Sequence, residues 1–165
     1  MERIDVKQLE LNPFSVISDD AFLLTAGEAM NYNTMAAGWG GFGYLWNKPV
    51  VYVFVRESRH TLSFLESSPR FSASFFPPEY RKAIDHCGSV SGRTESKKAE
   101  NAGLHPIEIG GTVAFEEANL VFACRKLSKV FIGEKDILDS DALRNYPNGD
   151  WHYMYIGEIE GVYIS

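Results

Sequence analysis

Short apolar or alternating runs, separated by glycine, proline and polar residues, recur along the chain and predict strands. The run VVYVFV at 50–55 is apolar throughout, which is typical of a strand buried on both faces. The alternating segment at 71–76 stops at two prolines, which cannot donate to a ladder. In the longest run we expect a break near Gly157 or Gly161. Strands are predicted at 15–18, 22–28, 50–55, 71–76, 119–127 and 152–164.

Helical signals are fewer and shorter. The predicted helix at 61–68 ends before Pro69, and the one at 78–88 opens with proline and closes with glycine. The helix at 96–103 ends at Gly103, and the one at 140–146 begins with Ser140 as its cap and is stopped by Pro147. A tight turn is expected at Asp19-Asp20. Helices are predicted at 61–68, 78–88, 96–103 and 140–146.

These elements do not alternate regularly between strand and helix, which disfavours a doubly wound parallel sheet. Five or more strands with three or four short helices favour a mainly β fold, an antiparallel β-barrel with short flanking helices. The length of 165 residues predicts a single domain, residues 1–165.

Composition narrows the class further. Apolar residues make up 45% of the chain and charged residues 23%, so extended disorder is not expected. No apolar run approaches the ~20 residues of a membrane helix, and the N-terminus does not resemble a signal peptide. Two cysteines are too few for a disulfide framework or a cysteine-rich zinc site. We therefore expect a cytoplasmic protein without a membrane partner.

The charge is unevenly distributed. The net charge is −6, so the broad basic surface that nucleic acids require is absent and no nucleic-acid partner is expected. Residues 56–98 nevertheless hold eight basic and five acidic side chains, a local charge of +3. A basic island in an acidic chain suits a small anionic ligand, although a solvated basic surface would give the same pattern.

The segment 31–46 interleaves four glycines with aromatic residues. Glycine lets the backbone approach a flat ligand closely, so that its amide groups can bond the ligand's edge. Asn33 and Thr34 offer polar groups, while Met35 and Trp39 offer apolar contact area. The alternative is a glycine-rich hairpin packed by its own aromatic residues.

The segment Arg56-Glu-Ser-Arg-His-Thr61 follows the buried strand and leads into a predicted helix. Arginine donors, hydroxyls and the free amides of a helix N-terminus match a phosphate monoester. The alternative is a plain helix cap made by Ser58 with solvated arginines. We favour the phosphate site.

A second loop, from Cys87 to Lys97, places two serines between Gly88 and Gly92 and is followed by basic residues, which also suits an anion. It lacks the spacing of a nucleotide-triphosphate loop, and no dinucleotide fingerprint occurs. The four histidines show no metal-binding spacing, so no metal site is expected. No catalytic triad or other catalytic residue can be identified, and both cysteines are expected to be unreactive.

Taken together, these segments resemble the flavin reductase-like, FMN-binding split-barrel family, and within it the flavoredoxin-like branch. The resemblance covers most of the chain in order. It is carried by Asn33-Thr-Met-Ala-Ala-Gly-Trp39, Trp46-Asn-Lys-Pro49, Arg56-Glu-Ser-Arg-His-Thr61, Ser74-Phe-Phe-Pro77, Cys87-Gly-Ser-Val-Ser-Gly-Arg93 and Met154-Tyr-Ile-Gly-Glu-Ile159.

The resemblance implies a split barrel that forms a homodimer and binds one FMN per subunit. By that analogy, Asn33, Thr34, Met35 and Ala36 would line the edge of the flavin ring, largely through backbone groups. The phosphate would be held by a second set, comprising Arg56, Ser58, Arg59, Thr61, Ser89, Ser91 and Lys97, with His60 beside it.

Two positions depart from the pattern of the family. Ala36 stands where the family usually has threonine, so a hydroxyl near the flavin ring is lost while the backbone amide remains. His60 stands where an aromatic residue such as tyrosine is expected. We expect binding to survive the change at Ala36, while its effect on the flavin chemistry stays open; the change at His60 is the milder one.

The resemblance implies an FMN-dependent oxidoreductase that passes a hydride from NAD(P)H to flavin, with free flavin or a redox protein as the acceptor. Two alternatives remain open. One is a flavoredoxin-type FMN electron carrier that serves a protein partner. The other is a non-enzymatic module that binds flavin or a tetrapyrrole.

Overall fold

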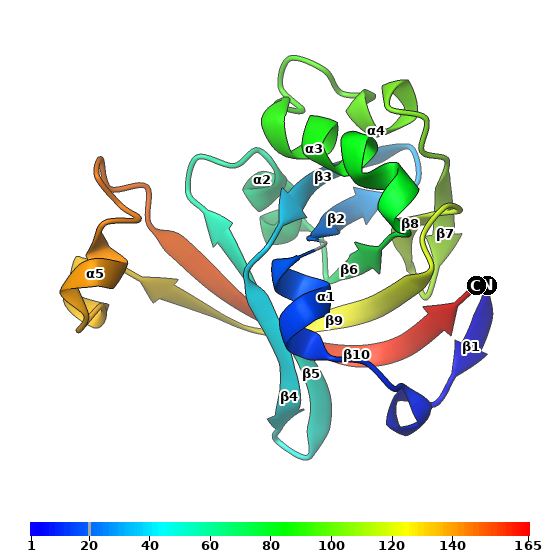
Figure 1. Cartoon of the computed structure of the whole chain (residues 1–165), viewed down its shortest axis with the longest axis horizontal. Coiled ribbons are helices and arrows are strands. Elements are labelled where there is room, and N and C mark those ends of the chain that lie inside the picture. The colour runs from blue at the N-terminus through cyan, green and yellow to red at the C-terminus, as the bar shows by residue number, and fades with distance from the viewer. Residues whose placement is uncertain (20) are drawn as a thin grey trace.

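A long, strongly curved antiparallel sheet organises the molecule (Figure 1). The computed structural model describes residues 1–19 and 21–165. The sheet has the order β3-β2-β6-β9-β10-β5-β4, with β1 paired to β10, and a separate hairpin joins β7 to β8. The strands are β1 (Glu2–Ile4), β2 (Phe22–Glu28), β3 (Asn31–Ala37), β4 (Gly40–Leu45), β5 (Lys48–Arg56), β6 (Arg70–Phe75), β7 (Pro106–Ile109), β8 (Thr112–Phe115), β9 (Leu120–Ile132) and β10 (His152–Ile164).

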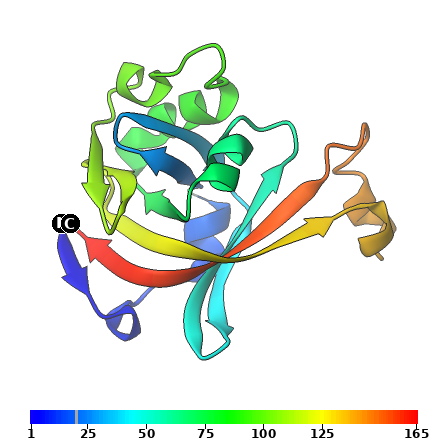
Figure 2. The ribbon, with the colours of Figure 1, turned by 180° about the vertical axis from the view of Figure 1, so that it is seen from behind.

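Short helices flank the sheet (Figure 2). The α-helices are α1 (Pro13–Ser18), α2 (Thr61–Ser67), α3 (Arg81–Ser89), α4 (Lys98–Asn101) and α5 (Ser140–Leu143). Single 3-10 turns are η1 (Val6–Gln8), η2 (Pro78–Tyr80) and η3 (Glu134–Asp136). Helix α3 packs on β3, and β3 in turn contacts β5. The sheet thus curls into a barrel, which confirms the expected mainly β fold with helices outside.

Alternation along the central strands divides the core into two clusters. Leu24 on β2 and Phe122 on β9 belong to the cluster inside the barrel, with Phe71 and Phe75. Their neighbours Leu23 and Val121 point to the opposite face and pack under α3 with Ile84 and Phe115. Successive side chains of a strand face opposite sides, so a single sheet supports both clusters.

Most of the expected elements are confirmed, with one clear error. The predicted strand at 15–18 is wrong, because these residues lie in helix α1. The Asn12 side chain accepts a hydrogen bond of 3.0 Å from the backbone N–H of Phe14, and Pro13 opens the helix with its fixed φ. A capping asparagine before proline outweighed the β-branched residues that follow. The turn expected at Asp19-Asp20 includes Asp20, which lies outside the described residues.

The predicted helices are found with changed boundaries. The segment 78–88 divides into η2 and α3, the segment 96–103 contains only the short α4, and α5 is capped by Asp139 and not by Ser140. The glycine-rich segment 31–46 forms β3 and β4, which were not among the predicted strands; β1, β7 and β8 were also missed.

Strand β10 bends twice, and both expected sites of irregularity are confirmed. Its register with β9 shifts between Ile156 and Gly157 and again between Ile159 and Gly161. A Cβ atom at Gly157 would lie 2.5 Å from the Phe71 ring, so only glycine fits there. Such bulges increase the local bend of a strand.

Beyond these bends, β9 and β10 extend away from the barrel. We call residues 128–151, which contain the end of β9, η3 and α5, the arm (left in Figure 1). The arm exposes apolar side chains: Val130 is 41% exposed, Phe131 44% and Leu138 98%. Exposed apolar groups gathered on a projection are typical of a contact surface.

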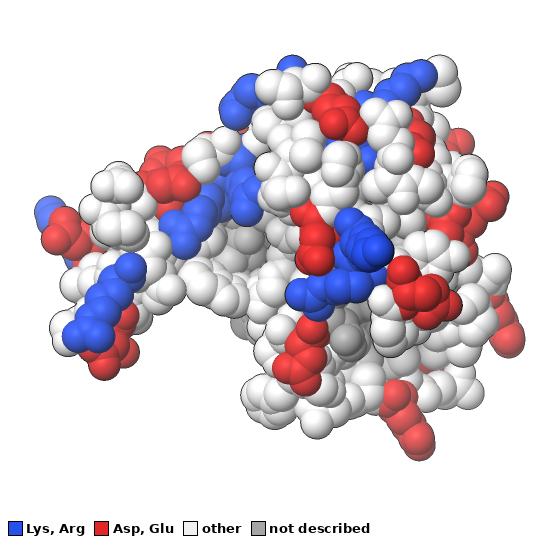
Figure 3. Space-filling view, turned by 45° about the horizontal axis from the view of Figure 1, so that its top comes forward, with Lys and Arg blue, Asp and Glu red and all other residues white. Residues whose placement is uncertain are grey.

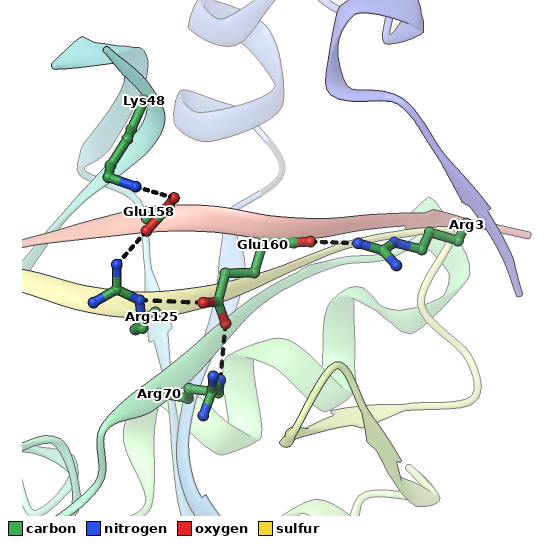
Figure 4. A network of polar contacts seen from close by, with 6 residues as sticks. All are labelled: Arg3, Lys48, Arg70, Arg125, Glu158 and Glu160. Atoms are coloured by element: carbon green, nitrogen blue, oxygen red, sulfur yellow. Dashed lines mark hydrogen bonds and ion pairs between the residues drawn. The ribbon is translucent and has the colours of Figure 1, made fainter. Parts of the chain in front are cut away.

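On the outer face of the barrel, β10 carries two glutamates that join several strands (Figure 4). Glu158 pairs with Lys48 of β5 at 2.6 Å and with Arg125 of β9 at 2.5 Å. Glu160 pairs with Arg125 at 3.1 Å and with Arg70 of β6 at 2.9 Å. A connected network of this kind holds four strands in register more firmly than isolated surface pairs would. None of the described helices is long and apolar enough to cross a membrane.

Candidate functional site

Two adjoining pockets open between β3, the end of β5, the start of α2 and the loop after α3. The polar pocket, a cavity of about 250 Å³, is lined by the hydroxyls and basic side chains of these segments. The aromatic pocket, about 160 Å³, is lined by β3 and the residues after it, together with Trp39, Phe54 and His152. Met35, Arg56 and Arg59 line both pockets. A charged and a flat apolar compartment therefore share one wall.

The structure brings most of the expected site residues together. The polar pocket is lined by Asn33, Met35, Arg56, Ser58, Arg59, His60, Thr61, Ser89 and Ser91. Ala36 lines the aromatic pocket. These residues come from three segments of the chain that are far apart in sequence. The barrel brings the segments together by setting β3 beside β5 and by packing α3 on β3.

Two expected residues lie outside both pockets. Thr34 is buried, and its hydroxyl accepts a 2.9 Å hydrogen bond from the Thr25 hydroxyl and donates one of 3.3 Å to the Leu24 carbonyl. It alternates with Asn33 and Met35, so its side chain faces the other side of β3. Lys97 is exposed at the start of α4.

The neighbouring Lys98 reaches the polar pocket in place of Lys97. Its side chain is only 4% exposed, and its ammonium donates hydrogen bonds of 2.7 Å to the carbonyls of Cys87 and Val90. Burial lowers the pKa of Lys98, while the Cys87 thiol opposes that shift. Lys98 thus fixes the loop that carries Ser89 and Ser91. The two adjacent lysines are evident in the sequence. Which of them points into the pocket depends on where the four-residue helix α4 begins.

The two arginines are already engaged with the backbone. Arg56 donates to the carbonyls of Asp150 at 3.1 Å and Asn145 at 3.0 Å, and its guanidinium lies 5.0 Å from the Tyr146 ring. Arg59 donates to the Gly88 carbonyl at 2.8 Å. Arg56 therefore ties the base of the arm to the pocket, and Arg59 ties the C-terminal end of α3 to it.

Ser58 does not cap helix α2, contrary to the alternative considered from the sequence. Its N–H and hydroxyl donate to the Asp150 carboxylate at 2.8 and 2.7 Å. The cap position belongs to His60, which makes no side-chain capping bond. Asp150 itself adopts a left-handed φ of 61° and lines the polar pocket. One carboxylate thus faces the basic groups Arg56, Arg59 and Lys98.

Both histidines of the site are kept neutral. Burial, and then the charges of Arg93 and Lys98, lower the pKa of His60. Burial, and then the charge of Arg56, lower the pKa of His152 to about 4. The His152 Nδ1 lies 2.6 Å from the Tyr146 hydroxyl, and its ring centroid lies 5.2 Å from that of Trp39. The positive charge of the site near neutral pH therefore comes from the basic side chains and not from the two imidazoles.

Two glycines let the end of α3 and the loop after it approach β3. A Cβ atom at Gly92 would lie 2.3 Å from Asn33 Oδ1, and one at Gly88 would lie 2.8 Å from the Ala36 Cβ. Both glycines bracket the serine loop that the sequence pointed to. Their role here is close packing of the loop against β3, which positions the serines in the pocket.

Besides Lys98, the lining residues that sequence reasoning missed include Phe54, Asp150 and His152. Phe54 belongs to the run that was interpreted as a fully buried strand, yet its side chain is only partly buried and reaches the aromatic pocket. Asp150 and His152 lie far along the chain from the predicted site. The one indication of them in the sequence is that they lie at or just before the start of the last predicted strand, 152–164.

One further group of ionisable side chains was not expected. His105, Glu116 and Glu117 place potential ligand atoms within 4.8 Å of one another on the turns before β7 and after β8. Glu117 accepts hydrogen bonds from the His105 backbone N–H at 3.0 Å and pairs with Nδ1 at 2.5 Å. This pairing raises the pKa of His105.

Comparisons with known proteins agree with this fold. Flavoredoxin from Methanosarcina acetivorans matches with a TM-score of 0.71 at 23% identity over 100% of this chain and 76% of that chain. An FMN-binding domain of a flavin reductase-like enzyme from Shewanella baltica matches with a TM-score of 0.70 at 17% identity, over 99% and 76% of the two chains. An NADH:FAD oxidoreductase from Streptomyces globisporus gives 0.66 at 16% identity, over 88% and 75%.

The fold is therefore the split barrel found in FMN-binding flavin reductase-like proteins. The model of the flavin reductase-like domain matches residues 16–165, and the chain belongs to this family. The resemblance to the family that was stated from the sequence is thereby confirmed. None of the curated protein sequences compared with the chain matches it.

Proposed function

We propose that the two pockets bind FMN and that the chain is an FMN-dependent oxidoreductase, which passes a hydride from NAD(P)H to flavin. The observation that carries the proposal is the shared wall of the pockets. A cavity with hydroxyls and cations adjoins an aromatic one, and Met35, Arg56 and Arg59 belong to both. FMN has the same division into an anionic phosphate and a flat ring.

The donor set of the polar pocket suits a phosphate. Thr61, Ser89 and Ser91 supply hydroxyls, while Arg59 and Lys98 supply positive charge. Charge-assisted hydrogen bonds are the strong ones, and arginine presents its donors in a plane that matches phosphate oxygens. Ser58 and Arg56 line the same pocket, and their donors, like those of Arg59 and Lys98, already bond to acceptors of the protein.

The aromatic pocket would hold the ring against Met35 and Ala36 of β3. Bound FMN would supply the redox chemistry, and the chain would bind, orient and shield it. Trp39 and Phe54 supply the aromatic part of the lining of this pocket. Burial, and then the charge of Arg56, lower the pKa of His152, so the positive charge next to the ring comes from Arg56 and not from His152.

Fluorescence titration with FMN tests the proposal, followed by NADH and NADPH oxidation with added free flavin. The Arg59→Ala variant removes one charged donor and should weaken FMN binding by about 2 kcal/mol, roughly thirtyfold. Arg144→Ala, an exposed arginine on the arm, is the matched control. Failure of the wild-type chain to bind FMN would reject the proposal.

The electron carrier is the second candidate, since the similar structures include flavoredoxins as well as an NADH:FAD oxidoreductase. Steady-state turnover separates the two candidates. A carrier retains FMN but oxidises NAD(P)H only negligibly, whereas a reductase sustains oxidation with free flavin. A haem spectrum in the purified protein would instead indicate the tetrapyrrole-binding alternative.

We also propose that the protein is a homodimer that uses the arm as its contact surface. The supporting observation is the exposure of Val130, Phe131 and Leu138 on a projecting hairpin. A second copy would remove these side chains from water, which is favourable in proportion to the apolar area buried. Sedimentation of the wild type against Phe131→Asp tests the proposal. A wild-type monomer at micromolar concentration would contradict it.

A further inference from the structure

A third cavity lies beside the aromatic pocket, between helix α1 and the arm. We call it the α1 hollow; its volume is about 420 Å³. Its walls are formed chiefly by Phe14, Ile17, Trp39, Phe54, Ile132 and Tyr146. A recess between the arm and the rest of the molecule is visible in Figure 3, with lysine and arginine side chains along one rim.

The walls of the α1 hollow leave large aromatic groups in contact with water. Phe14 and Ile17 are three residues apart and therefore share one face of α1. Ile17 is 7% exposed and packs in the core, yet Phe14 is 83% exposed. Trp39 is 48% exposed on the opposite wall. Two exposed aromatic rings that flank one cavity indicate a surface suited to an apolar occupant.

The α1 hollow is continuous with the proposed flavin site. Trp39 and Phe54 line both the α1 hollow and the aromatic pocket, so a molecule in one would contact residues of the other. Arg56 lies 5.9 Å from the Trp39 ring and 5.0 Å from the Tyr146 ring, on the side of the aromatic pocket. The guanidinium thereby makes cation–π contacts with both aromatic walls.

The charge of the walls restricts the kind of occupant. Among the described lining residues of the α1 hollow there is no lysine, arginine, aspartate or glutamate. An ionised group placed there would lose hydration without gaining a partner, which is costly. Flat aromatic walls favour a planar ring, through stacked or edge-on contacts.

We propose that the α1 hollow binds the uncharged aromatic ring of the organic molecule that exchanges electrons with the flavin. The inference rests on the proposed function and specifies its acceptor. A 1,4-quinone is an acceptor of this class. It would receive the two electrons and two protons of the reduced flavin and leave as the hydroquinone, with NAD(P)H as the source of reducing equivalents.

The test is calorimetric titration of the protein, with and without FMN, using 2-methyl-1,4-naphthoquinone as the probe. We expect saturable binding with one site per chain. The Phe14→Ala variant should weaken it at least tenfold. Trp46→Ala is the matched control, because Trp46 is a 61% exposed aromatic residue at the turn between β4 and β5, outside the α1 hollow. A sulfonated naphthoquinone should bind at least tenfold more weakly than the uncharged probe.

Several outcomes would overturn the inference. These are no binding of the probe, equal losses in Phe14→Ala and Trp46→Ala, or equal affinity for the sulfonated compound. Binding that appears only when a dimer is diluted to monomers would also overturn it, since the occupant would then be a second copy of the chain. FMN affinity is measured separately, so a protein that binds FMN but not the probe rejects this inference and leaves the proposed function intact.

Discussion

Replacing Lys98 by methionine should both destabilise the protein and weaken the binding of FMN. Methionine keeps most of the length of the side chain but removes the two 2.7 Å hydrogen bonds to the Cys87 and Val90 carbonyls. Hydrogen bonds to a charged group contribute roughly 1.5–3 kcal/mol each. The relief of a buried ammonium offsets part of the loss, so we expect a net decrease of about 3 kcal/mol in the free energy of unfolding.

The pH dependence of stability provides a second readout of Lys98. Burial holds its pKa in the folded protein below the ordinary value of 10.5. Between these two pKa values the unfolded chain binds more protons than the folded chain, so the free energy of unfolding contributed by this group rises with pH. Lys98→Met should lack that rise, because methionine does not titrate.

Urea unfolding at several pH values and thermal melting measure these effects. At roughly 2–4 °C per kcal/mol for a chain of this size, the melting temperature should fall by about 6–12 °C. The matched control is Lys97→Met, which changes the exposed residue just before the same helix. Lys98→Met should also weaken FMN binding about tenfold, because Ser89 and Ser91 are held less firmly and a positive charge is lost. Lys97→Met should leave FMN binding unchanged. Equal behaviour of the two variants would refute the assignment of Lys98 to the loop.

Three further outcomes are expected. Gly157→Ala should lower the free energy of unfolding by about 1–3 kcal/mol, because the added methyl group overpacks against Phe71. Gly41→Ala is the control: its added Cβ would lie 3.6 Å from the nearest atom of the Tyr52 ring, so it should have little such effect. Urea unfolding of the two variants measures the difference. The His152 ring should titrate near pH 4 in NMR spectra, and its contribution to stability should fall as the pH is lowered from 6.5 towards 4, because the unfolded chain then takes up the proton first. Glu160→Gln should lower the melting temperature slightly at low salt and hardly at all at 1 M NaCl, since screening weakens the network it joins; a salt-independent loss would contradict this.

The predictable part of the fold is the part fixed by local patterns. The run at 50–55 and the bends at Gly157 and Gly161 could be identified because they depend on apolar continuity and on the absence of a side chain. Strand β3 could not be separated from a glycine-rich loop, because its pairing with β2 is a long-range contact that its composition does not encode. The segment 15–18 failed because a cap at Asn12 decided the structure of the residues after it.

In the candidate site, too, local patterns predicted some features, and long-range packing decided the others. The three segments that line it could be picked out by residue type, because hydroxyls, glycines and arginines are clustered in sequence. The direction of each side chain could not. Thr34 and Lys97 have the right chemistry but face away from the pockets, whereas Lys98 and His152 reach them. A strand's register and the phase of a short helix decide these directions, and both are set by packing.

Hydrogen bonds made by Arg56 and Asp150 connect the arm to the polar pocket. Arg56 ends β5 and bonds the carbonyls of Asn145 and Asp150, while the Asp150 carboxylate receives both donors of Ser58. Any contact that displaces the base of the arm must therefore disturb the wall of the polar pocket. Conversely, an anion that drew Ser58 away from Asp150 would loosen the arm. Ligand binding in the pocket and contacts made by the arm are thus expected to be thermodynamically coupled, each altering the affinity of the other by the same factor.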